Sequence, residues 1–508
     1  MVAAGLGVLL LTGTADAKTY EVTRTGDPAP GGCTPSDCSL REAVQAANAR
    51  AGADTIVLPN RRRDYKLTIP GDTADDASDG DLDVTNDPLA IVHQGKGQAT
   101  IRGVELGDRL FDVFNTSPLR IVKLRLTGGA VPFPNGNGGA IRASAPVTIR
   151  KGAVSGNSTG EVGGAIDTEA ALTIIRSVVA DNEANGQGGA LNVADVAPLR
   201  IVRSVFRGNE TNSTGGAIRN SDGELTILRS RFVRNSAASQ GGVLRNAGDG
   251  PILIDRSTFN RNTTGAVGGA LELSQSETVI RRTTISGNRA EGNGGGIENS
   301  SAGVIRIVAS TISRNRAGGN GGGMHIDGPT ASVVNSTFEG NLADERGGGI
   351  NAQDGADLSL NAVTVTRNRS AADDLGPKLL LTGGGLSRIS SVGFDVRNSL
   401  IALNTMGAPG VATRNDCAGD TEFDSLGHNL VSRRDSTSCE GFDEPSDLVR
   451  DKPKVAKLRR NGGPTKTVAL RKGSAAIGEA HKPSAPDRDQ RNRRRDSKPD
   501  IGAFERGA

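Results

Sequence analysis

The chain has 508 residues, 60 of them basic and 57 acidic, and its formal net charge at neutral pH is +3. Residues 488–498 alone hold six basic and two acidic side chains, so the remainder is close to neutral, which argues against nucleic acid as a partner. Seventy glycines, two tyrosines and no tryptophan favour a narrow aliphatic core and leave almost no aromatic rings for stacking against sugars.

The first residues have the pattern of an export signal. Residues 5–11 form a short apolar segment, and residues 15–17 are of the small-x-small type that signal peptidase cleaves. We expect a signal peptide over residues 1–17 and a mature chain that begins at Lys18. The basic residues that usually begin a signal peptide are missing, which favours a misplaced start codon. The alternative is a buried N-terminal strand. No other segment is apolar for long enough to span a membrane. The sequence therefore predicts a secreted protein, either free or loosely held at the cell surface.

Four cysteines in an exported chain predict two disulfide bonds, for which three pairings are open. We expect Cys33 to pair with Cys38 and Cys417 with Cys439. Each of these pairs is close in sequence and lies outside the repeat described below, where it would staple one end of the molecule. The spacing does not match a zinc site, and we expect neither a metal nor a cofactor.

Residues 19–25 are expected to form a strand, and residues 39–48 a helix. Ser39 and Glu42 have the spacing of a capping box, in which each side chain binds the other residue's backbone N–H. The apolar face of this helix consists of Leu40, Ala43, Val44 and Ala47. Such a helix can cover the open end of a strand stack, where core and strand edges are otherwise exposed. Residues 38–48 resemble the CSLREA-type N-terminal motif of secreted bacterial β-helix proteins.

Short strands of irregular coils are expected over residues 55–58, 65–69, 82–84, 89–92, 100–101, 110–114 and 119–126. Between them, residues 72–83 hold six acids and no base. A calcium loop is one interpretation, but Ala77 stands where the EF-hand pattern requires an acid or amide, and no closing glutamate follows. We therefore expect a solvated acidic loop.

From residue 138 to residue 404 the chain repeats about every 26 residues. Each unit has a Gly-Gly pair, one further residue and an apolar residue, and it closes on an asparagine about sixteen residues later. The apolar position is occupied by Ile141, Ile166, Leu191, Ile218, Leu244, Leu271, Ile297, Met324, Ile350 and Leu386. The closing asparagines are Asn157, Asn182, Asn209, Asn235, Asn262, Asn288, Asn315, Asn341, Asn368 and Asn404. A fixed period of this size indicates stacked units that bury their apolar sides against one another.

The pattern inside a unit identifies its structure. Residues 225–227 alternate apolar and polar, Phe232 is expected to point inward after a corner, and no helical period appears. Three short strands and three turns per unit describe one coil of a parallel β-helix. Because parallel crossovers are right-handed, the expected fold class is an all-β, right-handed parallel β-helix, with about ten regular coils about 4.8 Å apart, irregular N-terminal coils and one helical cap.

The asparagines are expected to form a hydrogen-bonded ladder between coils. The Gly-Gly-Ala-Ile and Phe-x-x-Asn elements are similar to the repeat of bacterial polymorphic outer membrane proteins, over residues 138–404. That resemblance implies the fold and not an activity.

The residue after each apolar position forms a polar column: Arg142, Asp167, Asn192, Arg219, Arg245, Glu272, Glu298, His325, Asn351 and Ser387. We expect this column to face outward. Glu272, Glu298 and His325 would then lie about 4.8 Å apart, close to the carboxylate separation of retaining glycosidases. These three residues are the catalytic candidates, and the alternative is a solvated polar face. Motifs of pectate lyases and polygalacturonases occur only as fragments, at residues 75–76, 373–374 and 427–428.

A second column lies six residues before each closing asparagine. Its first six members are cations: Lys151, Arg176, Arg203, Arg229, Arg256 and Arg282. The last four are Ala309, Asn335, Ala362 and Asn398. Cations stacked at about 4.8 Å repel one another, so they need acidic neighbours or an anionic polymer, and burying them would cost too much. We expect them to face outward and to bind an acidic glycan or a teichoic-acid-like chain; the alternative is a surface on which Asp and Glu alternate with them.

The step between the ninth and tenth units is 36 residues, and the extra residues lie near 371–382. Insertions of this kind often mark a binding side of a solenoid. Beyond Asn404, residues 416–417, 425–430, 461–465, 473–477 and 500–505 resemble the C-terminal region called choice-of-anchor Q, with Ala475, Gly478 and Pro499 where relatives carry Pro, Asp and Cys. In that family the module precedes a surface anchor; no anchor pattern follows here, which implies release or noncovalent retention.

The sequence thus predicts a signal peptide (1–17), an N-terminal cap (18–85), the β-helix (86–405) and an anchor-like C-terminal region (406–508). The expected function is noncatalytic adhesion by a secreted or surface-associated monomer. Its expected partners are cell-wall or extracellular polysaccharide, or the surface of a host or neighbouring cell. The alternative is a polysaccharide lyase or glycoside hydrolase on the same scaffold, which the scarcity of aromatic residues and the missing lyase motifs disfavour.

Overall fold

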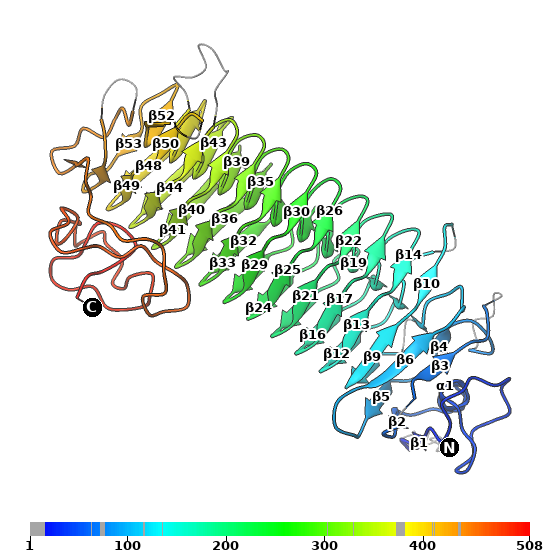
Figure 1. Ribbon diagram of the computed structural model, residues 1–508. Helices are drawn as coiled ribbons and strands as arrows, with labels where there is room; N and C mark the ends of the chain where they lie inside the picture. Colours follow the sequence, from blue (N-terminus) through cyan, green and yellow to red (C-terminus); the bar gives the residue numbers. More distant parts are fainter. Residues whose placement is uncertain are drawn as a thin grey trace, which may run out of the picture.

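The computed structural model describes residues 16–507, apart from residues 62, 72–76, 115–116, 135, 302, 329, 372–381, 409, 411 and 435–437. These residues form a long right-handed parallel β-helix with a short helix at its N-terminal end (Figure 1). The fold class predicted from the repeat is confirmed. Most of the expected signal peptide and of the insertion near residues 371–382 lies outside the described residues.

Each regular coil has four strands, where three were expected. The strands build four sheets, which a coil visits in the order C, A, B and D. The strands of sheet D have two residues each, too few for an apolar–polar alternation to show in the sequence. The pairings between neighbouring strands are parallel, except for β50 with β51 in sheet D.

Sheet C starts at the apolar residue that follows each Gly-Gly pair. Its strands are β4 (Leu82–Val84), β7 (Phe111–Val113), β11 (Ile141–Ala143), β15 (Ile166–Thr168), β19 (Leu191–Val193), β23 (Ile218–Asn220), β27 (Leu244–Asn246), β31 (Leu271–Ser274), β35 (Ile297–Ser300), β39 (Met324–Asp327), β43 (Ile350–Gln353), β47 (Leu386–Ile389) and β52 (Cys417–Gly419).

Sheet A comes next in each coil. Its strands are β1 (Thr19–Glu21), β2 (Asp54–Leu58), β5 (Leu89–His93), β8 (Leu119–Val122), β12 (Val147–Arg150), β16 (Leu172–Ile175), β20 (Leu199–Val202), β24 (Leu225–Leu228), β28 (Ile252–Asp255), β32 (Glu277–Arg281), β36 (Val304–Val308), β40 (Thr330–Val334), β44 (Asp357–Asn361), β48 (Gly393–Arg397) and β53 (Asp424–Ser425).

Sheet B follows a sharp corner. Its strands are β3 (Tyr65–Leu67), β6 (Ala99–Gly103), β9 (Leu124–Thr127), β13 (Ala153–Ser155), β17 (Val178–Ala180), β21 (Val205–Arg207), β25 (Arg231–Val233), β29 (Thr258–Asn260), β33 (Thr284–Ser286), β37 (Thr311–Ser313), β41 (Thr337–Glu339), β45 (Thr364–Thr366), β49 (Leu400–Ala402), β54 (Leu430–Val431) and β55 (Leu448–Val449).

Sheet D lies after the closing asparagine. Its strands are β10 (Ala130–Val131), β14 (Ser158–Thr159), β18 (Glu183–Ala184), β22 (Glu210–Thr211), β26 (Ser236–Ala237), β30 (Thr263–Thr264), β34 (Arg289–Ala290), β38 (Arg316–Ala317), β42 (Leu342–Ala343), β46 (Arg369–Ser370), β50 (Thr405–Met406) and β51 (Thr413–Arg414).

Identical positions stack from coil to coil and fill the core. In sheet B, the rings of Phe206, Phe232 and Phe259 stack with centroids 4.9 and 4.8 Å apart, and all three side chains are buried. Each such aromatic contact stabilises the fold by about 0.5–1.5 kcal/mol beyond the contribution of the apolar area that it buries. The inward prediction for Phe232 is confirmed.

The asparagine ladder is also confirmed. The side-chain amide of Asn235, for example, donates to Oδ1 of Asn262 at 3.0 Å and to the carbonyl of Phe206 at 3.3 Å, and the backbone N–H of Asn235 donates to the same Oδ1 at 3.0 Å. The same bonds recur along the series up to Asn404, whose amide donates to Asp416 Oδ1 at 2.9 Å. A carboxylate therefore ends the ladder, which the repeat alone did not reveal.

The N-terminal end is covered by helix α1 (Leu40–Asn48), with Ser39 as its N-cap and Glu42 completing the capping box. The apolar face predicted for this helix is buried in the main core. Arg41 is fully buried and makes a two-bond ion pair with Asp27, at 2.8 and 3.0 Å. Its guanidinium also donates to the carbonyls of Ala77, Asp79, Gly80 and Asp81. The helix is thus bonded to the acidic segment that the sequence placed in solvent.

The C-terminal end is closed by residues beyond the last asparagine. Phe423 lies between Phe394 and Phe442, with ring centroids 4.9 and 5.7 Å apart. The expected disulfides, Cys33–Cys38 and Cys417–Cys439, are both formed. Residues 450–507, here called the C-terminal lobe, then turn back and lie beside the last coils (Figure 1).

Candidate functional site

The cationic column lies at the corner between sheets A and B. Its six members, Lys151, Arg176, Arg203, Arg229, Arg256 and Arg282, all have φ between 51° and 53°. This left-handed conformation costs an ordinary residue about 1–2 kcal/mol. The residue that follows each arginine of the column stabilises the corner. Ser230, which follows Arg229, donates from Oγ to the carbonyl of Leu228 at 2.9 Å and accepts from the N–H of Ser204 at 3.2 Å. A buried serine ladder, which sequence reasoning missed, thus lies directly behind the cations.

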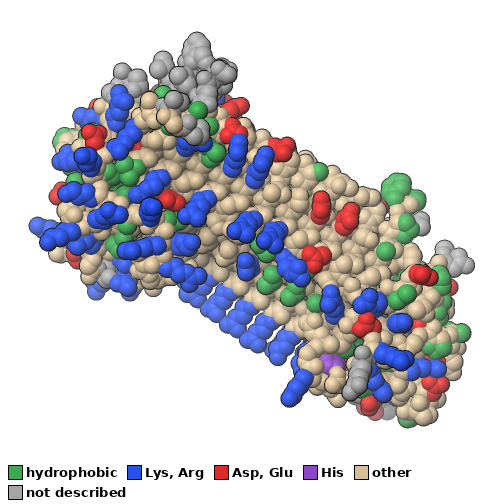
Figure 2. Space-filling model, in the orientation of Figure 1, with side chains coloured by type: hydrophobic (Ala, Val, Ile, Leu, Met, Phe, Trp, Pro, Cys, Tyr) green, Lys and Arg blue, Asp and Glu red, His purple; other side chains and the backbone are tan. Residues whose placement is uncertain are grey.

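The outward orientation predicted for these cations is confirmed. Five of them are exposed, and Arg282 is partly exposed. A stepped row of Lys and Arg side chains runs along one edge of the solenoid in Figure 2. We call these six residues the cationic corner.

The expected alternation with acidic side chains is not found at most of the cationic corner. Arg282 makes a two-bond ion pair with Asp255, at 2.8 Å for both bonds. Within the part of the chain that the structure describes, the other five cations have no carboxylate partner. Adjacent rungs of a sheet are about 4.8 Å apart, well inside the Debye length of about 8 Å in physiological salt. Among the described residues, no ion pair therefore offsets the mutual repulsion of these five cations.

A shallow groove with a volume of about 490 Å³ follows this corner. Arg150, Arg176, Arg203 and Arg229 line it, and its floor includes Ile175, Val202 and Leu228 at the ends of sheet A strands. The groove therefore combines a row of guanidinium groups with a narrow apolar strip, and its lining also includes Asp255, which is paired with Arg282.

The composition of this column changes where the C-terminal lobe covers it. Thr465 Oγ1 donates to the carbonyl of Ala309 at 3.2 Å, and Asn335 donates from Nδ2 to the carbonyl of Arg488 at 2.7 Å. Asn398 Oδ1 accepts from the N–H of His481 at 2.7 Å, and Ala362 is fully buried. This corner position therefore carries a cation on the open coils, whereas beneath the lobe it carries alanine or asparagine.

The prediction that the polar column faces solvent is wrong. Glu272, Glu298 and His325 do stand next to one another in register across β31, β35 and β39. Their exposed fractions, however, are 2%, 4% and 0%. The backbone of the preceding corner lies close against these side chains. The first glycine of the pair has a positive φ at Gly268, Gly294 and Gly321, and a Cβ on Gly294 would lie 2.6 Å from Glu298 Oε2.

The buried polar column has the chemistry of a structural network. Glu272 pairs with Arg245 and accepts from Ser274 Oγ at 2.9 Å. Burial raises the pKa of Glu298 well above its usual range and lowers the pKa of His325 to about 3. Glu298 Oε1 lies 3.9 Å from His325 Nε2, and the other ring nitrogen of His325 bonds with Asn351 Nδ2 at 3.0 Å. With solvent excluded from all three candidates, a glycosidic bond cannot reach them in this conformation.

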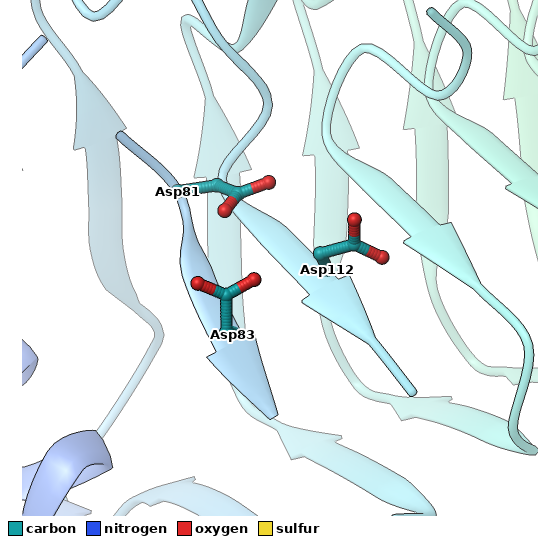
Figure 3. A group of neighbouring side chains, drawn as sticks. All are labelled: Asp81, Asp83 and Asp112. Atoms are coloured by element: carbon teal, nitrogen blue, oxygen red, sulfur yellow. The ribbon is translucent and has the colours of Figure 1, made fainter. Parts of the chain in front are cut away.

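The described part of the acidic segment is also buried, which corrects the expected solvated loop. Asp81, Asp83 and Asp112 come together from the edge of β4 and from β7, with oxygen atoms within 4.8 Å of one another (Figure 3). Burial, with the nearby Asp108 and Asp83 carboxylates, raises the pKa of Asp81 to about 8. Arg109 bonds to both Asp81 and Asp112 at 3.2 Å, and a second guanidinium, from Arg142, bonds to Asp112. These cations account for the cluster as an internal ion-pair network.

Several cations were missed by the sequence reasoning. Lys123 occupies the same corner one coil before Lys151, with φ of 57°, where one continuous strand was expected over residues 119–126. Arg261 and Arg314 directly precede closing asparagines and have positive φ as well. The signal for them was present in the sequence, because glycine and arginine share that position of the repeat.

The chain is similar to one family repeat over a short stretch and to solved structures at low identity. The model of the Chlamydia polymorphic membrane protein repeat matches residues 335–353, a stretch shorter than one coil. No curated protein matches the chain. Among solved structures, the A-module of the mannuronan C-5 epimerase AlgE6 from Azotobacter vinelandii is 14% identical, with a TM-score of 0.36, over 82% of this chain and 100% of that one. Pectate lyase Pel9A is 13% identical, with a TM-score of 0.27, over 97% of this chain and 98% of that one.

In the described residues, no helix combines the length and the apolar character that crossing a bilayer would require.

Proposed function

We propose that this protein is an exported, noncatalytic β-helix that holds an anionic glycan along its cationic corner. The observation that carries this proposal is the row of five exposed cations that have no carboxylate partner among the residues that the structure describes. A polyanion laid along the row would replace the missing counter-charges at many points at once. Several weak contacts on one rigid support combine because the second and later contacts are intramolecular.

Export is supported by the two disulfide bonds, because such bonds persist in oxidising compartments. The apolar residues 5–11 are the sequence feature that agrees with it. The resemblances to the CSLREA-type motif and to the choice-of-anchor Q region belong to the same proposal, which places the protein outside the cell, free or loosely held at a surface, as a monomer.

The second candidate function is a polysaccharide lyase or glycoside hydrolase with Glu272, Glu298 and His325 as its catalytic residues. Their adjacency in register favours it, and their burial disfavours it. Turnover of a polysaccharide by the purified protein that Glu298→Gln abolishes would support this candidate over the first.

The proposal predicts that replacing three corner cations weakens binding to an anionic polysaccharide. The variant is Arg203→Asn, Arg229→Asn and Arg256→Asn, because asparagine tolerates the left-handed conformation and occupies the same position at Asn335 and Asn398. We expect the affinity for polygalacturonate to fall by at least about tenfold, which corresponds to a loss of about 1.4 kcal/mol of contact energy. Each lost contact also releases fewer counterions, so the dependence of log K on log salt becomes shallower.

The matched control removes the same number of exposed cations elsewhere, in the variant Arg289→Asn, Lys452→Asn and Lys482→Asn. It has the same net charge as the corner variant, and its affinity is expected to stay within about twofold of the wild type. Neutral dextran serves as the uncharged ligand. Equal affinities of the corner variant and the wild type for polygalacturonate at every salt concentration would refute the proposal.

A further inference from the structure

A cleft of about 420 Å³ lies where the cationic corner meets the C-terminal lobe. One wall is the outer face of sheet B, on strands β29, β33 and β37, and the other is the lobe segment from Leu458 to Lys466. Thr258 and Thr284 of this cleft stand two residues after Arg256 and Arg282 of the corner. The groove of the corner and this cleft therefore occupy consecutive coils.

The lobe wall of the cleft is fixed by hydrogen bonds to the solenoid. Thr311 Oγ1 donates to the carbonyl of Lys466 at 2.6 Å. Gln490, fully buried, donates from Nε2 to Thr311 Oγ1 and to Thr465 Oγ1, each at 2.9 Å. Together with the bond from Thr465 to Ala309, these contacts close the cleft on its C-terminal side and leave it open toward the uncovered coils. The cleft is therefore preformed, with one blind end.

The lining of the cleft is cationic and rich in hydroxyl groups. Arg261 and Arg314 project from the solenoid, and Arg460 and Lys466 project from the lobe; all four are exposed. In the described part of the chain none of the four has a carboxylate partner within ion-pair distance. The buried Glu339 interacts electrostatically with Arg314, Arg367 and Lys466, and burial raises its pKa. The cleft thus has an excess of positive charge.

Thr284 and Ser286 supply hydroxyl groups between these cations. Hydroxyl groups can both donate to and accept from the hydroxyls of a sugar, whereas guanidinium and ammonium groups bind carboxylate, sulfate or phosphate. A lining that combines both kinds of group fits a charged sugar better than a free inorganic anion.

We infer that this cleft binds the terminal anionic sugar residue of the glycan whose chain lies along the cationic corner. The inference rests on the proposed function, and it adds that the protein recognises a chain end. The blind end beneath the lobe carries this point, because a chain that enters from the open coils must stop where Thr311 and Thr465 bond the lobe to the solenoid. Sugar carboxylate, sulfate and phosphate share the required charge.

The test measures the binding of short and long anionic glycans to the full-length protein by titration calorimetry. The cleft variant is Arg261→Asn with Arg460→Asn, one substitution on each wall. For this test the corner variant carries two substitutions in place of the three above, Arg176→Asn and Arg203→Asn, which lie several coils away from the cleft. Trigalacturonate, a heparin-derived trisaccharide and a glycerol phosphate trimer distinguish the three sources of charge. We expect one of them to bind the wild type and the corner variant alike, and to bind the cleft variant at least about tenfold more weakly.

The corner variant also tests the chain-end assignment, since it retains the cleft. When this variant is titrated with polygalacturonate of increasing length, we expect one protein molecule to bind per glycan chain, whatever the chain length. Binding in proportion to chain length would overturn the assignment.

The two proposals fail in different ways. Long polygalacturonate that binds the wild type and loses affinity in the corner variant, with no short glycan affected by the cleft variant, would overturn the cleft inference and leave the proposed function standing. A short glycan that depends on the cleft, with long-chain binding unaffected by the corner variant, would overturn the proposed function and leave the cleft as an anionic sugar site. Thermal unfolding of both variants checks that the lobe remains docked.

Discussion

Single positions of the repeat carry distinct physical tasks. The asparagines satisfy backbone groups between coils, the serines hold the corner, and the arginines accept a strained φ because their side chains leave the protein there. Sequence reasoning found the asparagines and arginines by counting. It placed Glu272, Glu298 and His325 on the outside because alternation distinguishes the two faces of a strand but not what covers the outer face.

Asp416 illustrates a residue whose role lies outside the repeat. It accepts from the amide of Asn404 with Oδ1 and from the N–H of Ser432 with Oδ2, each bond between 2.8 and 2.9 Å. Burial raises its pKa from 3.8 to about 6, against the lowering effect of these hydrogen bonds.

A pH dependence of stability follows from Asp416. The fold binds this proton more tightly than the unfolded chain, so its contribution is fully present below about pH 4 and is lost as the pH rises through about 6. The unfolding free energy should fall over this interval by on the order of 3 kcal/mol on account of this group. Asp416→Asn cannot titrate, so the stability difference between wild type and variant should decline from pH 4 to pH 7 in denaturant titrations; a constant difference would contradict the assignment.

At the scale of elements, helix α1 is fixed by one buried cation. The capping box and the apolar face predicted the helix and its ends to within a residue. The sequence could not show that Arg41 would pair with Asp27 and bind four carbonyl groups of the segment before β4, because those residues meet only when the first coils form.

Arg41→Met is expected to loosen the N-terminal cap. Removing one partner of a buried ion pair costs about 3–5 kcal/mol, because the other charge stays buried alone. In a solenoid this loss acts on the nearest coils, so hydrogen exchange should accelerate in α1 and β4 and remain unchanged beyond about the third coil. The double variant Arg41→Met with Asp27→Asn removes both charges and should recover part of the protection. Unchanged exchange in α1 would show that the apolar face alone holds the helix.

At the scale of the whole molecule, the C-terminal lobe divides the solenoid into an open part and a covered part. It packs Val468, Leu470 and Ile501 against Leu400 of sheet B. Its basic segment is largely internal: Arg495 pairs with Glu505 at 3.0 Å and Arg491 with Asp489 at 2.7 Å. The positive charge counted in residues 488–498 is thus partly used inside the fold.

The substitution Ala362→Arg tests this division. Arginine fits the backbone conformation, since φ is 55° at Ala362 and about 52° at the arginines of the open coils. The side chain would have to enter the buried contact between solenoid and lobe, where an unpaired charge and the added volume cost several kcal/mol. We expect the lobe to become sensitive to limited proteolysis while the coils stay folded. Arg229→Ala, the converse change at an uncovered coil, should leave the lobe protected.

The sequence by itself determined the coil length, the parallel β-helix, the ladder and the cap, because these depend on local spacing and on a period that every coil repeats. For the disulfides it favoured one of three open pairings, which the structure confirms. The tertiary structure decided which outward positions remain in solvent. The glycine corners bury the carboxylate column, and the lobe, more than a hundred residues further along the chain, covers one end of the cationic column. A cleft between a coil and a distant lobe leaves no periodic pattern in the sequence. The cations along the open corner could therefore be counted in the sequence, but the site at which they end could be found only in the folded chain.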